Sequence, residues 1–551
     1  MTKFRISAVA LMLALAGIGS GGSAYAADMP IATKAEAAPA ATPVPAPPGP
    51  CASVPDFFLS SCTLSAYGVQ LYGIVDMGVT YQTHGAPFDP NHPVGASYLL
   101  GAGGTGATNR NAGFYLGPNG MSQSLVGLRW REPLGGGWEW IGVGELAFDP
   151  YSLLLANAPQ AFQSNKGIPQ NQQELPYDSS RWGWLAGSIY TGVNHPTFGT
   201  LTFGRMNSLL NDSLTAYDPF GAAYAFAMVG YSGKYAGAGG TEEARWTTAI
   251  KYRVNIGDFR FAAMGQPLAG SDAGYNAYNP NNGAVAGQIG SDIRGLGPGV
   301  FSWDTIFSWE RDAVNISALY PGQVLTPVGP GGGWPLTFPA TSGLKATISD
   351  NTSIAAMAKY SFGSWAQPTG PGGASVPSGI PLTLYASYQY INLANPSNTQ
   401  TTSLLNDGFT FNFVNNAGSV LSTNGTTIAN NAFNANCGSG KGCTSEAFQF
   451  IYGGFKYGIT KDLDLISAWY HEWQNTFVIG VPQCSQGVSA AASNSRCAGY
   501  MDAVSVAFDW RFLPKWDWYI GTMYSAAAGG IANGDISRNN LATTTGIRFR
   551  F

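Results

Sequence analysis

The chain has 551 residues, of which 11% are charged and 45% are hydrophobic, whereas about a quarter of an average soluble domain is charged. Its 73 glycines and 34 prolines interrupt the sequence too often for long helices. After position 30 no apolar run reaches the roughly 18 residues that a membrane-spanning helix needs, so composition excludes a helical membrane bundle. The formal net charge of −4 gives nucleic acid no basic surface to bind.

The N-terminal segment has the features of a secretory signal peptide. Two basic residues precede an apolar stretch at residues 6–19, and a small-residue cleavage motif ends at Ala26. We therefore expect residues 1–26 to be removed on export. Residues 27–65 are rich in Ala and Pro at first and predict a periplasmic linker. The remaining domain, residues 66–551, is expected to lie in the membrane.

The six cysteines fall into three local pairs, and export places them in an oxidising compartment. Six cysteines allow many connectivities, but proximity favours disulfides between Cys51 and Cys62, Cys437 and Cys443, and Cys484 and Cys497. The alternative is that the cysteines bind zinc instead of forming disulfides. Because no pair has CxxC spacing and no histidine lies near one, we predict no metal site.

Beyond the linker, runs of about ten residues alternate apolar and polar side chains between Gly, Pro, Asn or Asp, which is the period-2 pattern of strands. The predicted strands are sixteen, at residues 66–82, 122–131, 137–148, 182–194, 198–208, 244–256, 258–268, 298–310, 312–320, 353–362, 380–393, 446–459, 462–475, 499–513, 515–527 and 541–551. Long gaps alternate with short ones, apart from an irregular connection at 363–379. This alternation predicts an all-β, 16-stranded antiparallel transmembrane barrel with long extracellular loops and short periplasmic turns.

Side-chain alternation in the last strand separates two faces. Leu541, Ile547 and Phe549 share one face, while Arg548 and Arg550 share the other. A soluble β-sandwich also shows this alternation. The strand lengths suit a tilted crossing of a bilayer, and aromatic residues gather near strand ends as in the girdles of membrane barrels. Together these features favour a barrel whose apolar face contacts lipid.

Three segments resemble a known family. Residues 67–76 read YGVQLYGIVD, residues 199–205 read GTLTFGR, and residues 546–551 read GIRFRF. They are similar to the first-strand, internal and terminal-strand patterns of general bacterial porins, and the Pro-rich, cysteine-bearing N-terminal region is most similar to that of alpha-proteobacterial members. The resemblance implies a homotrimer of 16-stranded barrels in outer-membrane lipid that admits small hydrophilic solutes. It also implies that Phe551 serves as an assembly signal for the outer-membrane insertion machinery.

The resemblance further implies that the third long loop, residues 209–243, folds into the barrel and narrows the channel. Its acidic residues are the candidates for the constriction: Asp212, Asp218, Glu242 and Glu243. The turn at residues 218–221 either shapes this loop or is a plain surface turn.

Strand alternation supplies the bases expected on the opposite wall: Arg129, Arg245, Lys251, Arg253 and Arg260. Arg205 joins them through the resemblance alone, because alternation groups it with Leu201 and Phe203. We expect loop acids to face wall bases and create a transverse field, with a weak preference for anions. The alternative is that these bases lie at the membrane edges, where charge is ordinary.

Such a channel needs no catalytic residue and no cofactor. The four histidines form no pattern typical of an outer-membrane hydrolase, and no GxSxG, HExxH or phosphate-binding loop occurs, so we expect no enzyme. Two other functions remain open: a surface adhesin or receptor built from the long loops, and a substrate-specific channel. A sugar-specific channel would use aromatic side chains such as Trp182, Trp184, Tyr190, Tyr224 and Tyr231.

Overall fold

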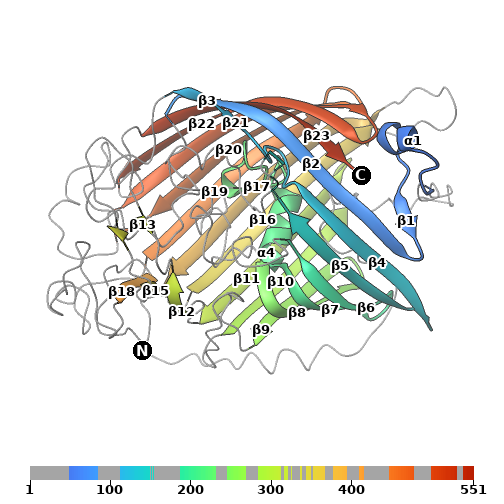
Figure 1. Ribbon diagram of the computed structural model, residues 1–551, viewed down its shortest axis with the longest axis horizontal. Coiled ribbons are helices and arrows are strands. Elements are labelled where there is room, and N and C mark those ends of the chain that lie inside the picture. Colours follow the sequence, from blue (N-terminus) through green and yellow to red (C-terminus); the bar gives the residue numbers. More distant parts are fainter. Residues whose placement is uncertain are drawn as a thin grey trace.

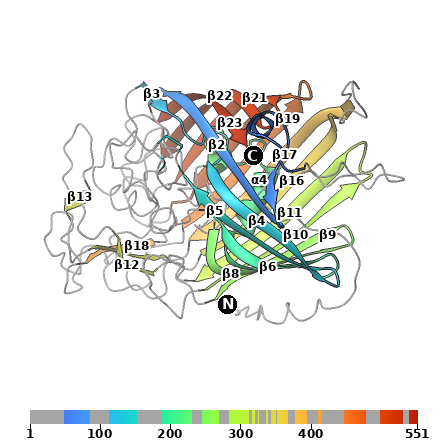
Figure 2. The ribbon, with the colours of Figure 1, turned by 45° about the vertical axis from the view of Figure 1, so that its right-hand side comes forward.

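The computed structural model describes residues 49–84, 112–148, 150–151, 153, 187–230, 245–267, 283–311, 315–319, 324–325, 336–337, 343–348, 351–365, 377–393, 409–414, 446–476, 498–529 and 538–551. Its main sheet contains 18 strands, of which β1 (Leu64–Ala66) and β3 (Gly113–Leu116) are short additions to β2. The other sixteen strands form a closed barrel (Figures 1 and 2). Among the described residues, no helix has the length and apolarity required to span a membrane.

The barrel strands follow one another around the wall in chain order. They are β2 (Val69–Gln82), β4 (Leu125–Gly135), β5 (Trp138–Ala147), β6 (Ile189–His195), β7 (Gly199–Asn207), β8 (Arg245–Ile256), β9 (Phe259–Pro267), β10 (Gly283–Arg294), β11 (Val300–Arg311), β16 (Asn351–Trp365), β17 (Pro377–Leu393), β19 (Glu446–Gly458), β20 (Leu463–Gln474), β21 (Gly499–Leu513), β22 (Trp516–Gly529) and β23 (Asn539–Arg550). Each pairs antiparallel with the next, and β2 pairs with β23 to close the barrel. The predicted fold class is confirmed.

Two strand predictions were wrong and offset each other in the count. The predicted strand 312–320 lies outside the barrel, because β12 (Asn315–Leu319) pairs with β15 (Gly343–Ile348) instead. The eighth barrel strand is β10, which the alternation pattern missed because its inward positions include Ala284, Ala286 and Gly290. β11 is therefore the ninth strand and runs in the direction opposite to the predicted one.

Other short elements lie between the barrel strands. β12, β15 and β18 (Phe409–Val414) form a three-stranded sheet, and β13 (Val324–Leu325) pairs with β14 (Leu336–Thr337). The irregular connection after residue 363 is partly an extension of the β16–β17 hairpin, in which Trp365 pairs with Pro377.

The two faces of the wall follow the predicted alternation. In β21, Val504 is 50% exposed and Phe508 and Trp510 are also exposed, while Ala503 and Asp509 are buried. The exposed face is apolar and suits lipid, whereas the inner face carries small and polar groups. Sixteen strands enclose more space than wall side chains fill, which leaves a lumen.

A helical segment of the third long loop occupies part of that lumen. α4 (Leu209–Tyr217) lies inside the barrel against β7, β9, β10, β11, β16 and β17 (Figure 1), and the 3-10 helix η5 (Met228–Gly230) follows it. The buried apolar side chains gather where this loop meets the wall, among them Leu209, Leu214 and Phe226. The predicted inward-folded loop is confirmed.

Candidate functional site: the loop and wall charges in the lumen

The sequence begins α4 at a defined point and gives it an acidic first turn. The Ser208 side chain caps the helix by accepting a hydrogen bond from the Asn211 N–H at 3.2 Å. Asp212 lies in the first turn, where the helix dipole favours a negative charge. Its Oδ2 accepts a hydrogen bond from Lys251 Nζ at 2.9 Å and pairs with Arg253 Nη2. One loop acid thus joins two bases of β8.

The other end of α4 also meets bases of the wall. Arg260 Nη2 donates to the Tyr217 hydroxyl at 2.9 Å, and Lys359 Nζ donates to the Ala216 carbonyl at 3.0 Å. Lys359 Nζ also lies 5.1 Å from the centroid of the Tyr217 ring. Cations are favoured at a helix C-terminus, so both ends of α4 match the wall electrostatically.

Two acids of the wall share Arg260. The Arg260 guanidinium lies 2.6 Å from Asp292 Oδ2 and 2.9 Å from Asp304 Oδ1. Four bases of the wall therefore lie beside α4 (Lys251, Arg253, Arg260 and Lys359), together with four acids: Asp292 and Asp304 on the wall, Asp212 in the helix and Asp218 at its C-cap. The wall beside the helix has a formal sum of 4 − 2 = +2, and the two loop acids bring the total to 0.

The charges around Asp212 are arranged differently from the predicted transverse field. The sequence suggested loop acids separated from wall bases by the channel, but Asp212 is in direct contact with Lys251 and Arg253. Lys251 is only 7% exposed. These ion pairs fix the helix on the wall rather than act across open water.

Asp218 shapes the loop instead of facing wall bases. Its Oδ2 accepts hydrogen bonds from the N–H groups of Phe220 at 3.0 Å and Ala222 at 2.9 Å, which forms a tight turn. Its Oδ1 accepts a 2.6 Å hydrogen bond from the Tyr470 hydroxyl on β20. Burial raises the pKa of Asp218 to about 6, against the opposing effect of these three donors. The turn at 218–221 is therefore an internal anchor of the loop.

The remaining predicted bases of the wall have neighbours away from α4. Arg129 Nε donates to Gln70 Oε1 at 3.0 Å, and its guanidinium lies 5.2 Å from the Tyr72 ring centroid. Arg245 Nε donates to Ser188 Oγ at 3.4 Å.

A β-bulge changes the orientation of Arg205. The register of β7 and β8 shifts between Gly204 and Met206, and Gly204 has a φ of +135°. A bulge turns the following side chains to the other face, so Arg205 is buried although alternation grouped it with Phe203. On β8, Trp246 lies opposite Met206 at the same register shift. It was expected on the apolar outer face and is fully buried.

Other predicted residues have mixed outcomes. The disulfide Cys51–Cys62 is present. Glu242, Glu243, the pairs Cys437 with Cys443 and Cys484 with Cys497, and the aromatic residues Trp182, Trp184 and Tyr231 lie outside the described residues. Sequence reasoning missed Lys359, Asp292 and Asp304. Asp304 and Lys359 lie in predicted strands, and the alternation of those strands would have placed both side chains on the polar inner face. Asp292 lies in β10, which was not predicted.

The chain is similar to one protein family and to several solved structures. A family model described as Gram-negative porin matches residues 13–466. No curated protein matches the chain. Among solved structures, the chain is similar to the anion-selective porin from Comamonas acidovorans, with 14% identity, 88% of this chain and 99% of that chain covered, and a TM-score of 0.46. It is also similar to Pseudomonas putida OprB, with 10% identity, 88% and 94% covered, and a TM-score of 0.45.

Proposed function

The chain belongs to the Gram-negative porin family and is an outer-membrane β-barrel channel, and on this premise we propose that small hydrophilic solutes and ions diffuse passively through it with a weak preference for anions. The observation that carries this proposal is α4, which narrows the lumen and lies beside four bases but only two acids of the wall. Narrow aqueous pores select ions through the sign of charge at the constriction. The function requires no catalytic residue and no cofactor.

Reversal potentials in a salt gradient across a planar bilayer test the selectivity. We expect a modest excess of anion over cation permeability for the wild-type protein. Lys359→Met removes one charge beside α4 and should move the reversal potential toward cation permeability. Lys461→Met is the matched control, because Lys461 lies in the β19–β20 turn and pairs only loosely with Asp462 at 3.8 Å. Clear cation selectivity of the wild type would contradict the proposal.

The same recordings separate passive diffusion from other functions. Currents that saturate on addition of sugar would favour the substrate-specific channel, and a complete lack of conductance would favour an adhesin or receptor.

We also propose that the protein assembles as a homotrimer and that Phe551 directs its insertion. Seminative electrophoresis should show a heat-modifiable band of about three times the monomer mass.

A further inference from the structure

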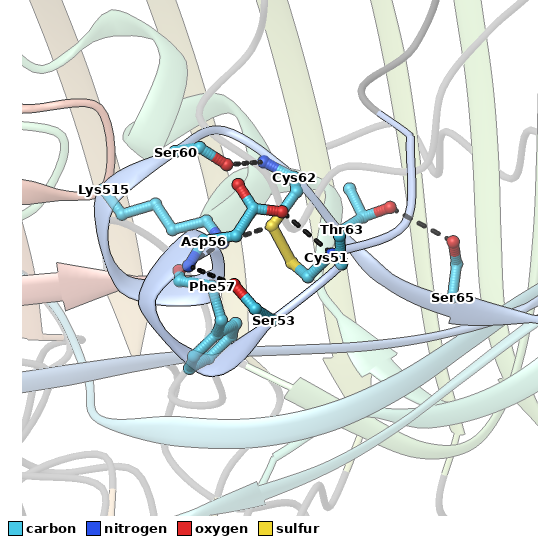
Figure 3. The surroundings of a disulfide bond; sticks show 10 residues. Cys51, Ser53, Asp56, Phe57, Ser60, Cys62, Thr63, Ser65 and Lys515 are labelled. Carbon is cyan, nitrogen blue, oxygen red and sulfur yellow. Dashed lines mark hydrogen bonds between the residues drawn. A yellow bond between two sulfur atoms is a disulfide. The ribbon is translucent and has the colours of Figure 1, made fainter.

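A small folded segment lies at the seam of the barrel, where β2 and β23 meet. We call residues 50–66 the clasp. The disulfide between Cys51 and Cys62 closes it (Figure 3). Pro50 forms a parallel bridge with Thr63, next to the two cysteines in sequence. The short helix α1 (Val54–Leu59) lies between the two cysteines. The last part of the predicted linker is therefore a closed, structured loop.

The sequence of the clasp stabilises its helix locally. Ser53 caps α1, since its hydroxyl accepts a hydrogen bond from the Asp56 N–H at 3.2 Å. In return, Asp56 Oδ2 accepts a hydrogen bond from the Ala52 N–H at 2.9 Å. Both contacts lie within the loop that the disulfide closes.

The barrel supplies the other cap of this helix. The last carbonyl groups of a helix lack partners within it, and here Lys515 Nζ donates to Phe57 O at 2.8 Å while Trp516 Nε1 donates to Phe58 O at 2.9 Å. Lys515 Nζ also lies 4.5 Å from the Phe57 ring centroid and 3.9 Å from Cys62 Sγ (Figure 3). The turn between β21 and β22 thus joins the clasp through its helix and its disulfide.

Aromatic rings of the clasp cover the end of the last strand. The Phe57 ring lies 5.6 Å from the Phe549 ring and 5.4 Å from the Phe551 ring, and Phe58 stacks on Phe549 at 5.5 Å. Phe549 shares the outward face with Ile547, which is 47% exposed, yet Phe549 is only 8% exposed. Such aromatic contacts add to the energy of apolar burial.

The clasp also continues the ladder where β23 stops. β23 pairs along β2 as far as Ile74, and Gly73 and Phe551 exchange two backbone hydrogen bonds of 2.9 Å. Two residues beyond Gly73 along β2, the pairing continues with β1, where Leu64 lies opposite Leu71. Unpaired backbone groups at a strand edge invite other pairings, so β1 completes the edge of the first barrel strand.

We infer that the clasp stabilises the barrel seam in a redox-dependent manner. While the disulfide is intact, the clasp stays docked across β2, β22 and β23. Reduction of the disulfide releases the clasp and opens the seam at the end of the barrel that carries the short turns. A dithiol reductant supplies two electrons and two protons, the Sγ–Sγ bond breaks to give two cysteine thiols, and the dithiol becomes a disulfide. Without the cross-link the undocked segment gains conformational freedom, so docking becomes less favourable.

The test measures how fast the folded protein unfolds in detergent at a fixed temperature, read as loss of the compact band on seminative gels. We expect about tenfold faster unfolding after the folded wild-type protein is treated with dithiothreitol. The variant C51S/C62S should unfold as fast as the dithiothreitol-treated wild type, and dithiothreitol should not change its unfolding rate further. Lys515→Met should unfold at an intermediate rate with the disulfide intact. The control C437S/C443S should match the oxidised wild type and keep its response to reductant.

Two results would overturn this inference. The first is an unchanged unfolding rate after reduction of the folded wild type, a measurement that stands even where the serine variant does not fold. The second is a reductant effect that disappears in C437S/C443S and persists in C51S/C62S. Either result would assign the clasp no part in closing the seam.

Discussion

The buried Asp218 carboxyl predicts a loop whose stability depends on pH. Its pKa in the folded protein is about 6, against an ordinary value of 3.8. The folded loop therefore favours the protonated form, and its stabilisation is complete below pH 3.8 and is lost as the pH rises toward and through 6. The difference of 6 − 3.8 corresponds to about 3 kcal/mol, or roughly 100-fold in the opening equilibrium.

Hydrogen exchange of the α4 amides at pH 4 and pH 7 measures this effect, with Asp218→Asn as the reference at each pH. The asparagine imitates the protonated acid and does not titrate, so comparison with it removes the intrinsic pH dependence of exchange. We expect the wild-type loop to open roughly 100-fold more often, relative to the variant, at pH 7 than at pH 4. Amides of β21 should show no such change. An equal ratio of wild type to variant at both pH values would refute the reasoning.

Three further substitutions test other parts of the site. Gly204→Val would place a Cβ 2.4 Å from the Ile189 carbonyl oxygen, at a φ of +135°. This variant should lower the stability measured by unfolding in detergent by about 1–3 kcal/mol. The control Gly287→Val should not, because a Cβ at that position meets nothing within 4 Å. Asp212→Asn removes the carboxylate shared by two wall bases, so reversal potentials should show stronger anion preference; an unchanged potential would mean that these bases do not act on permeating ions. Tyr470→Phe removes the hydroxyl that donates to the loop carboxylate and should speed α4 amide exchange by the equivalent of about 1.5–3 kcal/mol, whereas unaltered exchange would exclude that bond as an anchor.

Strong alternation in the sequence was enough to predict most of the barrel. In β21 and β23 bulky apolar residues alternate with small or charged ones, because one face meets lipid and the other the lumen. β10 lacked this contrast. Its inward positions hold Ala284, Ala286 and Gly290, and no spacing rule reveals that a helix from another part of the chain fills the space beside them.

The site was predictable to the extent that it depends on regular strands. Lys251 and Arg253 were placed on the inner wall by alternation and both contact the loop. Arg205 was not predictable in this way, because the bulge at Gly204 reverses the alternation. The role of Asp218 was also hidden, since its partner Tyr470 lies far away in sequence and is brought to it only by closure of the barrel.

The small side chains of β10 have a consequence for the shape of the pore without its loop. Three inward positions of β10 are small, at Ala284, Ala286 and Gly290, and Gln288 between them donates from Nε2 to Ser213 Oγ on α4 at 3.2 Å. Removal of the helix would therefore expose a hollow in the wall as well as the volume of the helix itself. A loop-deleted protein should form a lopsided opening, widest along β10, and large solutes would pass on that side first.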